Sequence, residues 1–179
     1  MSLYRGGASS AATDLAGLGA GSFDAVLLMG PLYHLLKEED RRRAAAEARR
    51  VLRPGGLLLA SFISRYAPLR DVAKFEPDWI VEHQADAEAV LARGVLVAPT
   101  GFTDAYFAHP TEVLPFMKEC GYEALDLVAC EGVISMIEEK VNGLTGAAWE
   151  AWVDLNHRLG KDPSVHGGAE HLLYVGRRT

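Results

Sequence analysis

Two apolar runs, residues 23–29 (FDAVLLM) and 57–63 (LLLASFI), decide the fold of this chain. Each run is continuous rather than alternating, which is typical of parallel strands that are covered on both faces. Residues 30–31 (GP) follow the first run and residues 54–56 (PGG) precede the second, and such pairs punctuate regular structure. The two runs therefore predict neighbouring, buried strands.

The segment between the runs, residues 38–52, predicts a helix. Acidic residues open it and arginines close it, so both ends suit the helix dipole. Its buried stripe is expected to be Ala44, Ala48, Val51 and Leu52. Strand, helix and strand at this spacing predict one right-handed βαβ unit.

The flanking sequence predicts the remaining organisation. Residues 1–22 are small and rich in glycine, and we expect a flexible N-terminal segment there. Residues 23–179 are expected to form one α/β domain, in which residues 64–108, rich in aromatics and interrupted by prolines, form a lid or insertion. The further expected helices are residues 86–91, 110–119, 133–141 and 147–159, and the further expected strands are residues 122–129 and 170–177.

Composition narrows the function classes. The 179 residues carry a net charge of −6, so the chain is a poor candidate for binding nucleic acid through its phosphates. No apolar run is long enough to cross a bilayer and no signal-peptide pattern opens the sequence, which predicts a cytosolic protein without a membrane partner. The two cysteines make neither a disulfide framework nor a four-ligand zinc site. The histidines after His34 show no metal-ligand spacing, so we expect no metal and read each of them as a surface or core residue.

Four segments together resemble a known family. Residues 21–36 (GSFDAVLLMGPLYHLL) and 51–63 (VLRPGGLLLASFI) resemble the fourth strand, the motif after it and the fifth strand of class I S-adenosylmethionine-dependent methyltransferases of the small-molecule type. Residues 109–131 resemble the last helix and sixth strand of that family, and residues 170–178 its seventh strand. The resemblance implies a fold class: α/β, a partial Rossmann-like methyltransferase sheet with the family's strands four to seven, the last strand antiparallel, and helices on both faces.

The sequence departs from the family in its first half. The family carries a glycine-rich loop after its first strand, which lets the backbone approach the cofactor. Gly17, Gly19 and Gly21 have the bare spacing, but no strand precedes them and a strand follows, so we read them as a loop. The chain thus resembles the C-terminal half of the fold. The family's first strand would lie beside residues 23–29, whose free edge should attract another chain, and a homodimer is the simplest closed solution.

The resemblance also assigns a cofactor and site residues. S-adenosylmethionine is the implied cofactor, and the backbone near residues 29–32 would face it. Tyr33 and His34 would face the methyl acceptor, with His34 as the best candidate for a general base. A structural role stays open for both residues, because His34 could cap a short helix and Tyr33 could pack in the core. The assigned cofactor-binding residues are Met29, Gly30, Pro31 and Leu32.

Residues after the second run supply the expected substrate pocket. Arg65 and Tyr66 follow that run directly, and Tyr106 closes the expected lid. Further pocket candidates are Trp79, Phe102 and Phe107. An aromatic lid favours a planar or apolar acceptor, although core packing explains most aromatics equally well.

Two function classes remain. The leading hypothesis is a methyltransferase that acts on a small molecule and is truncated relative to its family. This hypothesis leaves open whether the chain is active by itself. The alternative is a non-catalytic oligomerising or regulatory module derived from the same fold.

Overall fold

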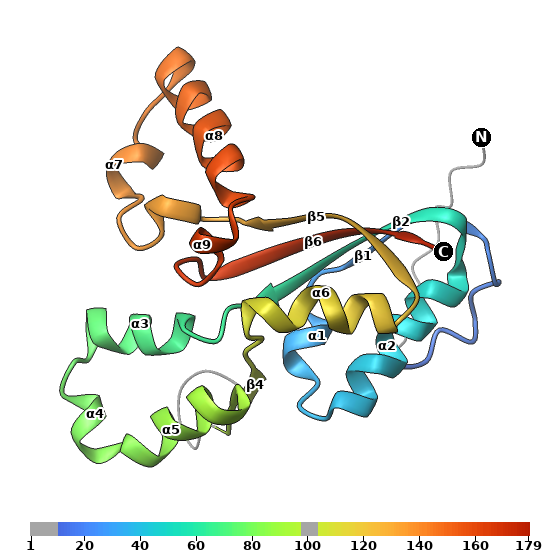
Figure 1. Ribbon diagram of the computed structural model, residues 1–179, viewed down its shortest axis with the longest axis horizontal. Coiled ribbons are helices and arrows are strands. Elements are labelled where there is room, and N and C mark those ends of the chain that lie inside the picture. Colours follow the sequence, from blue (N-terminus) through green and yellow to red (C-terminus); the bar gives the residue numbers. More distant parts are fainter. Residues whose placement is uncertain (1–10, 98–103) are drawn as a thin grey trace.

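The computed structural model describes residues 11–97 and 104–179. Its main sheet has the strand order β1-β2-β6-β5, shown in Figure 1. Strands β1 and β2 are parallel, and β6 runs antiparallel to both of its neighbours. This order and these directions confirm the predicted fold class. The strands are β1 Phe23–Leu28, β2 Leu52–Ile63, β5 Tyr122–Ala129 and β6 His171–Arg178.

Strand β2 begins five residues earlier than the sequence predicts. Leu52 pairs with Phe23, and the register then shifts before Ala25 pairs with Leu57. Pro54 and the two glycines after it therefore lie in an irregular part of the strand and do not end it. Gly55 adopts a φ of 74°, a left-handed conformation that glycine tolerates without a side-chain clash.

One face of the sheet carries the main core. Helices α1 (Pro31–His34), α2 (Glu38–Val51) and α6 (Pro110–Glu119) lie on this side (Figure 1). Alternate strand residues point toward these helices, because side chains of a strand alternate between its two faces. Helix α2 presents alanines to the sheet, so the two approach closely. The buried side chains of this cluster include Leu28, Leu32, Ala44, Ala48, Leu58, Phe62, Met117, Leu172 and Tyr174.

Among residues 11–97 and 104–179, helices cover the opposite face at one end of the sheet. Helix α8 (Gly146–Gly160) and helix α9 (Pro163–His166) lie over β5, where His166 Nε2 donates to the carbonyls of Leu127 and Gly160 at 3.1 Å each. Helices therefore lie on both faces, as predicted. Toward β1 the same face is open: Leu27 is 68% exposed and Leu57 is 37% exposed.

The segment expected to form a lid contains more helix than the sequence predicts. Pro68 lies in the first turn of its first helix, where a missing N–H costs no hydrogen bond. A second core cluster of Ile63, Ala67, Val90, Ala105 and Phe107 joins this segment to the end of β2. Its elements are α3 Ala67–Phe75, α4 Trp79–Glu82, α5 Gln84–Arg93, β3 Val95–Leu96 and β4 Ala105–Tyr106.

The predicted helix over residues 133–141 is wrong. A 3-10 turn, η1 (Gly132–Ile134), and a short helix, α7 (Glu139–Asn142), occupy this stretch instead. Met136 between them adopts a φ of 66°, which a right-handed helix cannot contain.

Residues 11–22 run along α2. The Leu15 N–H donates to Glu47 Oε2 at 2.8 Å, and Arg50 donates to the carbonyls of Leu15 and Leu18. The hydrogen bond from Arg50 and that from the Leu15 backbone lower the pKa of Glu47 to about 2. Within residues 11–97 and 104–179, no helix combines the length and apolar character needed to span a bilayer.

Candidate functional site

The carboxyl ends of β1 and β2 meet at one edge of the sheet, where open α/β sheets bind their ligands. Met29 follows β1 and is 46% exposed at this edge. Gly30 has a φ of 136°, a conformation that favours glycine, and it is buried, with the Tyr33 hydroxyl 3.7 Å from where a Cβ atom would stand. Pro31 then starts α1, whereas the Leu32 side chain is completely buried in the main core. Of the four predicted cofactor residues, Leu32 can therefore contribute only its backbone.

The two predicted catalytic residues lie together on α1. Their rings are 4.7 Å apart. Tyr33 is half-buried against the second core cluster, while His34 is exposed at the last position of the helix. The sequence left open whether Tyr33 packs in the core or faces the methyl acceptor. In the structure Tyr33 packs against the second core cluster and also lies beside exposed His34.

The predicted substrate residues contact side chains at the start of α6. Arg65 is buried and pairs with Glu112 at 2.7 Å, and Tyr106 donates to the same carboxylate at 3.2 Å. Tyr66 Oη lies 2.9 Å from His109 Nε2. The guanidinium of Arg41 stacks 3.5 Å above the Tyr106 ring, and burial raises the pKa of Tyr106. These contacts place the three residues beside the lid cavity rather than in its lining.

The lid cavity lies between α3, α4 and the adjoining ends of β2 and β6, with a volume of about 490 Å³. Trp79 and Phe107 line it, as the sequence suggested, whereas Phe102 lies outside the described residues. His171, Asp71 and their neighbours were missed by the sequence analysis. The strand that contains His171 could have indicated its position. A strand that pairs antiparallel with β2 begins beside the end of β2, where the cavity lies. The lining residues are Ile63, Ala67, Pro68, Asp71, Val72, Glu76, Trp79, Leu96, Phe107, Met136, Glu170 and His171.

His171 is held by a carboxylate from the end of β5. Glu131 Oε1 lies 2.8 Å from His171 Nδ1, and Glu131 Oε2 accepts the backbone N–H groups of Glu170 and His171. The hydrogen bond to Glu131 raises the pKa of His171. For Glu131, burial favours a higher pKa, but the hydrogen bonds from the His171 side chain and backbone outweigh it and lower the pKa. Both shifts in pKa therefore favour the ionised pair.

Glu131→Gln is expected to lower stability most between about pH 4.5 and 6.5, the ordinary pKa values of the two groups. Above 6.5 the contribution of the ion pair is lost as the pH rises through the raised pKa of His171, and below 4.5 it is lost as the pH falls through the lowered pKa of Glu131. The His171 side chain is 42% exposed, so solvent limits the difference to below about 1 kcal/mol. Urea unfolding of both proteins across pH 4–9 measures it, and a difference that grows above pH 8 would contradict the assignment.

Comparison with known proteins agrees with this architecture. The methyltransferase-domain family model matches residues 7–60. A comparison with curated protein sequences found no match.

Solved structures supply the closer comparison. A S-adenosylmethionine-dependent methyltransferase from Methanosarcina mazei has 15% identity and a TM-score of 0.58, covering 94% of this chain and 65% of that one. A Thermotoga maritima protein, described as a possible histamine N-methyltransferase, has 18% identity and a TM-score of 0.57, covering 95% of this chain and 62% of its own. The chain therefore spans somewhat less than two thirds of these proteins. Together with the family match, the likeness confirms the resemblance: the chain has the fold of the class I S-adenosylmethionine-dependent methyltransferases.

Proposed function

We propose that the chain contributes the acceptor side of a methyltransferase that transfers a methyl group from S-adenosylmethionine to a small molecule. The observation that carries this proposal is the lid cavity at the carboxyl end of β2, whose lining includes Ile63 and Phe107 of the core cluster that Tyr33 packs against. A pocket of a few hundred Å³ at this edge suits a small-molecule ligand. The cytosolic location and the lack of a nucleic-acid or membrane partner remain part of this proposal.

The residues at the end of β1 fit one end of the cofactor. Exposed Met29 offers an apolar surface for the methionine portion, and Gly30 after it is buried beneath Tyr33. The carboxylates of the first strand and of the segment before it lie elsewhere: Asp24, at the start of β1, pairs with Arg53 at 2.6 Å, and Asp14 accepts from the Ala16 N–H. The described residues thus fit the sulfonium end and supply no acid for the ribose hydroxyls, so we infer that this chain alone forms part of the cofactor site.

The chain's own residues would mainly position and deprotonate the acceptor. The bound cofactor supplies an electrophilic methyl group. The lid would hold the acceptor and exclude water from it. His34, exposed at the rim, would accept a proton from an acceptor that approaches beside Tyr33.

Calorimetric titration with S-adenosylhomocysteine tests the cofactor assignment. Micromolar binding to this chain supports a competent site, and no binding at millimolar concentration supports the alternative, a non-catalytic module. His34→Ala is expected to leave the affinity near that of the wild type, because the residue faces the acceptor. A large loss of affinity in this variant would contradict its assignment as a base.

We propose that the chain forms a homodimer in which a second copy covers the open face of the sheet and pairs with the edge of β1. In the described sheet β1 is an edge strand, and exposed edges pair readily. Leu27 and its register partner Leu59 continue the apolar surface onto β2, as do Ala25 and Leu57. A second copy presents the same edge and the same patch, so a two-fold axis beside β1 would satisfy both at once.

Leu27→Lys is expected to convert the dimer into a monomer, because it places a charge in the centre of the apolar patch. Light scattering coupled to size-exclusion chromatography measures the mass. The matched control is Val153→Lys on α8, which also replaces an exposed apolar residue (47% exposed) away from β1. A wild-type monomer, or a dimer that survives Leu27→Lys, would contradict this interface.

A further inference from the structure

We propose that the lid cavity binds a small organic amine and that His171 Nε2 accepts a proton from the bound ammonium group. The inference rests on the proposed methyl transfer and names the class of its acceptor. For an ammonium group it assigns the proton acceptor to His171 in place of His34. It draws on the charge of the cavity, its apolar walls and the geometry of His171.

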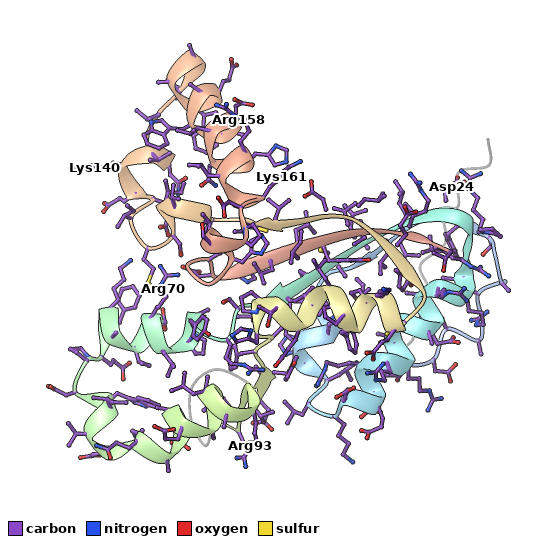
Figure 2. The ribbon with its side chains drawn as sticks, in the orientation of Figure 1. Asp24, Arg70, Arg93, Lys140, Arg158 and Lys161 are labelled. Carbon is purple, nitrogen blue, oxygen red and sulfur yellow. The ribbon has the colours of Figure 1, made fainter. Side chains whose placement is uncertain are left out.

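The charge of the lining is one-sided. Asp71 and Glu76 from the α3 region and Glu170 before β6 line the cavity, and its described lining contains no lysine or arginine. The two cations of α3 bind main-chain carbonyls instead: Arg70 donates to Gly168, and Lys74 donates to Met136 at 2.9 Å. Arg70 lies on the side of α3 that faces the start of β6 (Figure 2). The three carboxylates outnumber His171, the one titratable base in the described lining, and therefore favour a positively charged ligand and disfavour an anionic one.

The walls are apolar and partly aromatic. Trp79 and Phe107 face the cavity together with aliphatic side chains from β2 and α3. The Trp79 ring stacks on His83 with centroids 4.6 Å apart, which fixes its orientation. Such walls accommodate a hydrocarbon or aromatic body, while the carboxylates retain the ammonium group.

His171 offers one ring nitrogen to a ligand. Its Nδ1 is bonded to Glu131, so Nε2 is the atom left for a ligand in the cavity. When the ammonium N–H bond breaks, the electron pair stays on the amine nitrogen and the proton moves to Nε2. The resulting imidazolium is neutralised by Glu131 and is further favoured by the charge of Glu170, while Asp71 and Glu76 line the same cavity. The amine is then neutral and nucleophilic.

The same residues do not form a metal site in this arrangement. Ligand atoms of Glu131, Glu170 and His171 lie within 4.8 Å of one another, a spacing that a cation could bridge. Both Glu131 oxygens, however, already accept hydrogen bonds, and Glu170 Oε1 accepts from Ser135 at 3.3 Å. The cluster is therefore a satisfied ion pair.

Three matched probes test the charge preference: 2-phenylethylamine, 2-phenylethanol and phenylacetate, titrated into the chain at pH 7.5 and followed by NMR. We expect the amine to bind about 10-fold or more tightly than the alcohol, and phenylacetate to bind weakest. The His171 ring signals should shift on amine binding. Equal affinities for amine and alcohol, or no shift at His171, would overturn the proposal.

Variants separate the cavity from nonspecific attraction. The double variant Asp71→Asn with Glu170→Gln is expected to weaken amine binding about 10-fold and leave alcohol binding unchanged. Glu88→Gln is the control, because it removes the charge of an exposed glutamate on α5 that does not line the cavity. It should change the binding of neither the amine nor the alcohol. Displacement of the amine by Zn²⁺ would identify a metal site and overturn the proposal. The amine titration contains no cofactor, so it is independent of the titration with S-adenosylhomocysteine. A failure to bind the amine overturns this inference, whereas a failure to bind S-adenosylhomocysteine counts against the proposed cofactor site.

Discussion

Replacement of Gly94 by alanine is expected to destabilise the lid by about 3 kcal/mol or more. Gly94 ends α5 with a φ of 65°, and its N–H caps the helix on the Val90 carbonyl. Its carbonyl accepts the Phe107 N–H at 2.6 Å. A Cβ atom at Gly94 would lie far inside van der Waals contact of the Phe107 carbonyl oxygen and 3.2 Å from the Arg65 guanidinium. The substitution therefore separates α5 from the segment that leads into α6.

Gly55→Ala is the matched control for this variant. Gly55 has a φ of 74°, yet a Cβ there meets nothing within 4 Å, so the substitution adds backbone strain alone, about 1 kcal/mol. Chemical unfolding measures both variants, and hydrogen exchange of α3–α5 shows whether the lid opens first. Equal losses of stability at the two positions would contradict the close packing of Gly94.

The strands were predictable because their signals are local. The apolar runs at residues 23–29 and 57–63, and the helix and strand over residues 110–119 and 122–129, carry their patterns within a single element. The parallel pairing of β1 and β2 then follows from the helix between them, which must cross over the sheet. Sequence reasoning thus recovered the pairing of β1 with β2, and the family resemblance supplied the antiparallel direction of the last strand.

The lid and the candidate site were less predictable because they depend on contacts between distant segments. The left-handed conformation of Met136 ended a helical pattern that looked continuous. His171 joins the cavity only because β6 pairs with β2, a pairing of residues more than a hundred positions apart. Arg65 also depends on a distant contact: its place after β2 predicts a substrate contact, and the structure pairs it with Glu112 of α6, which the sequence did not indicate.

Arg65→Met is expected to lower the free energy of unfolding by about 2–3 kcal/mol. The guanidinium is buried, donates to Glu112 at 2.7 Å and lies within hydrogen-bonding reach of the Phe107 carbonyl at 3.4 Å. Its loss leaves these acceptors without their cation. Glu112 is 47% exposed and can turn to water, which keeps the loss at the lower end for a buried ion pair.

Arg53→Met provides the control, because Arg53 pairs with Asp24 at 2.6 Å but both side chains are at least 60% exposed. Surface pairs of this kind contribute little, so a change within about 0.5 kcal/mol is expected. Lysine at position 65 should restore only part of the stability, since an ammonium group lacks the planar fork that reaches several acceptors. If Arg65→Met retained full stability and instead abolished binding of 2-phenylethylamine, Arg65 would be a substrate residue after all, and the structural role of the Arg65–Glu112 pair would be wrong.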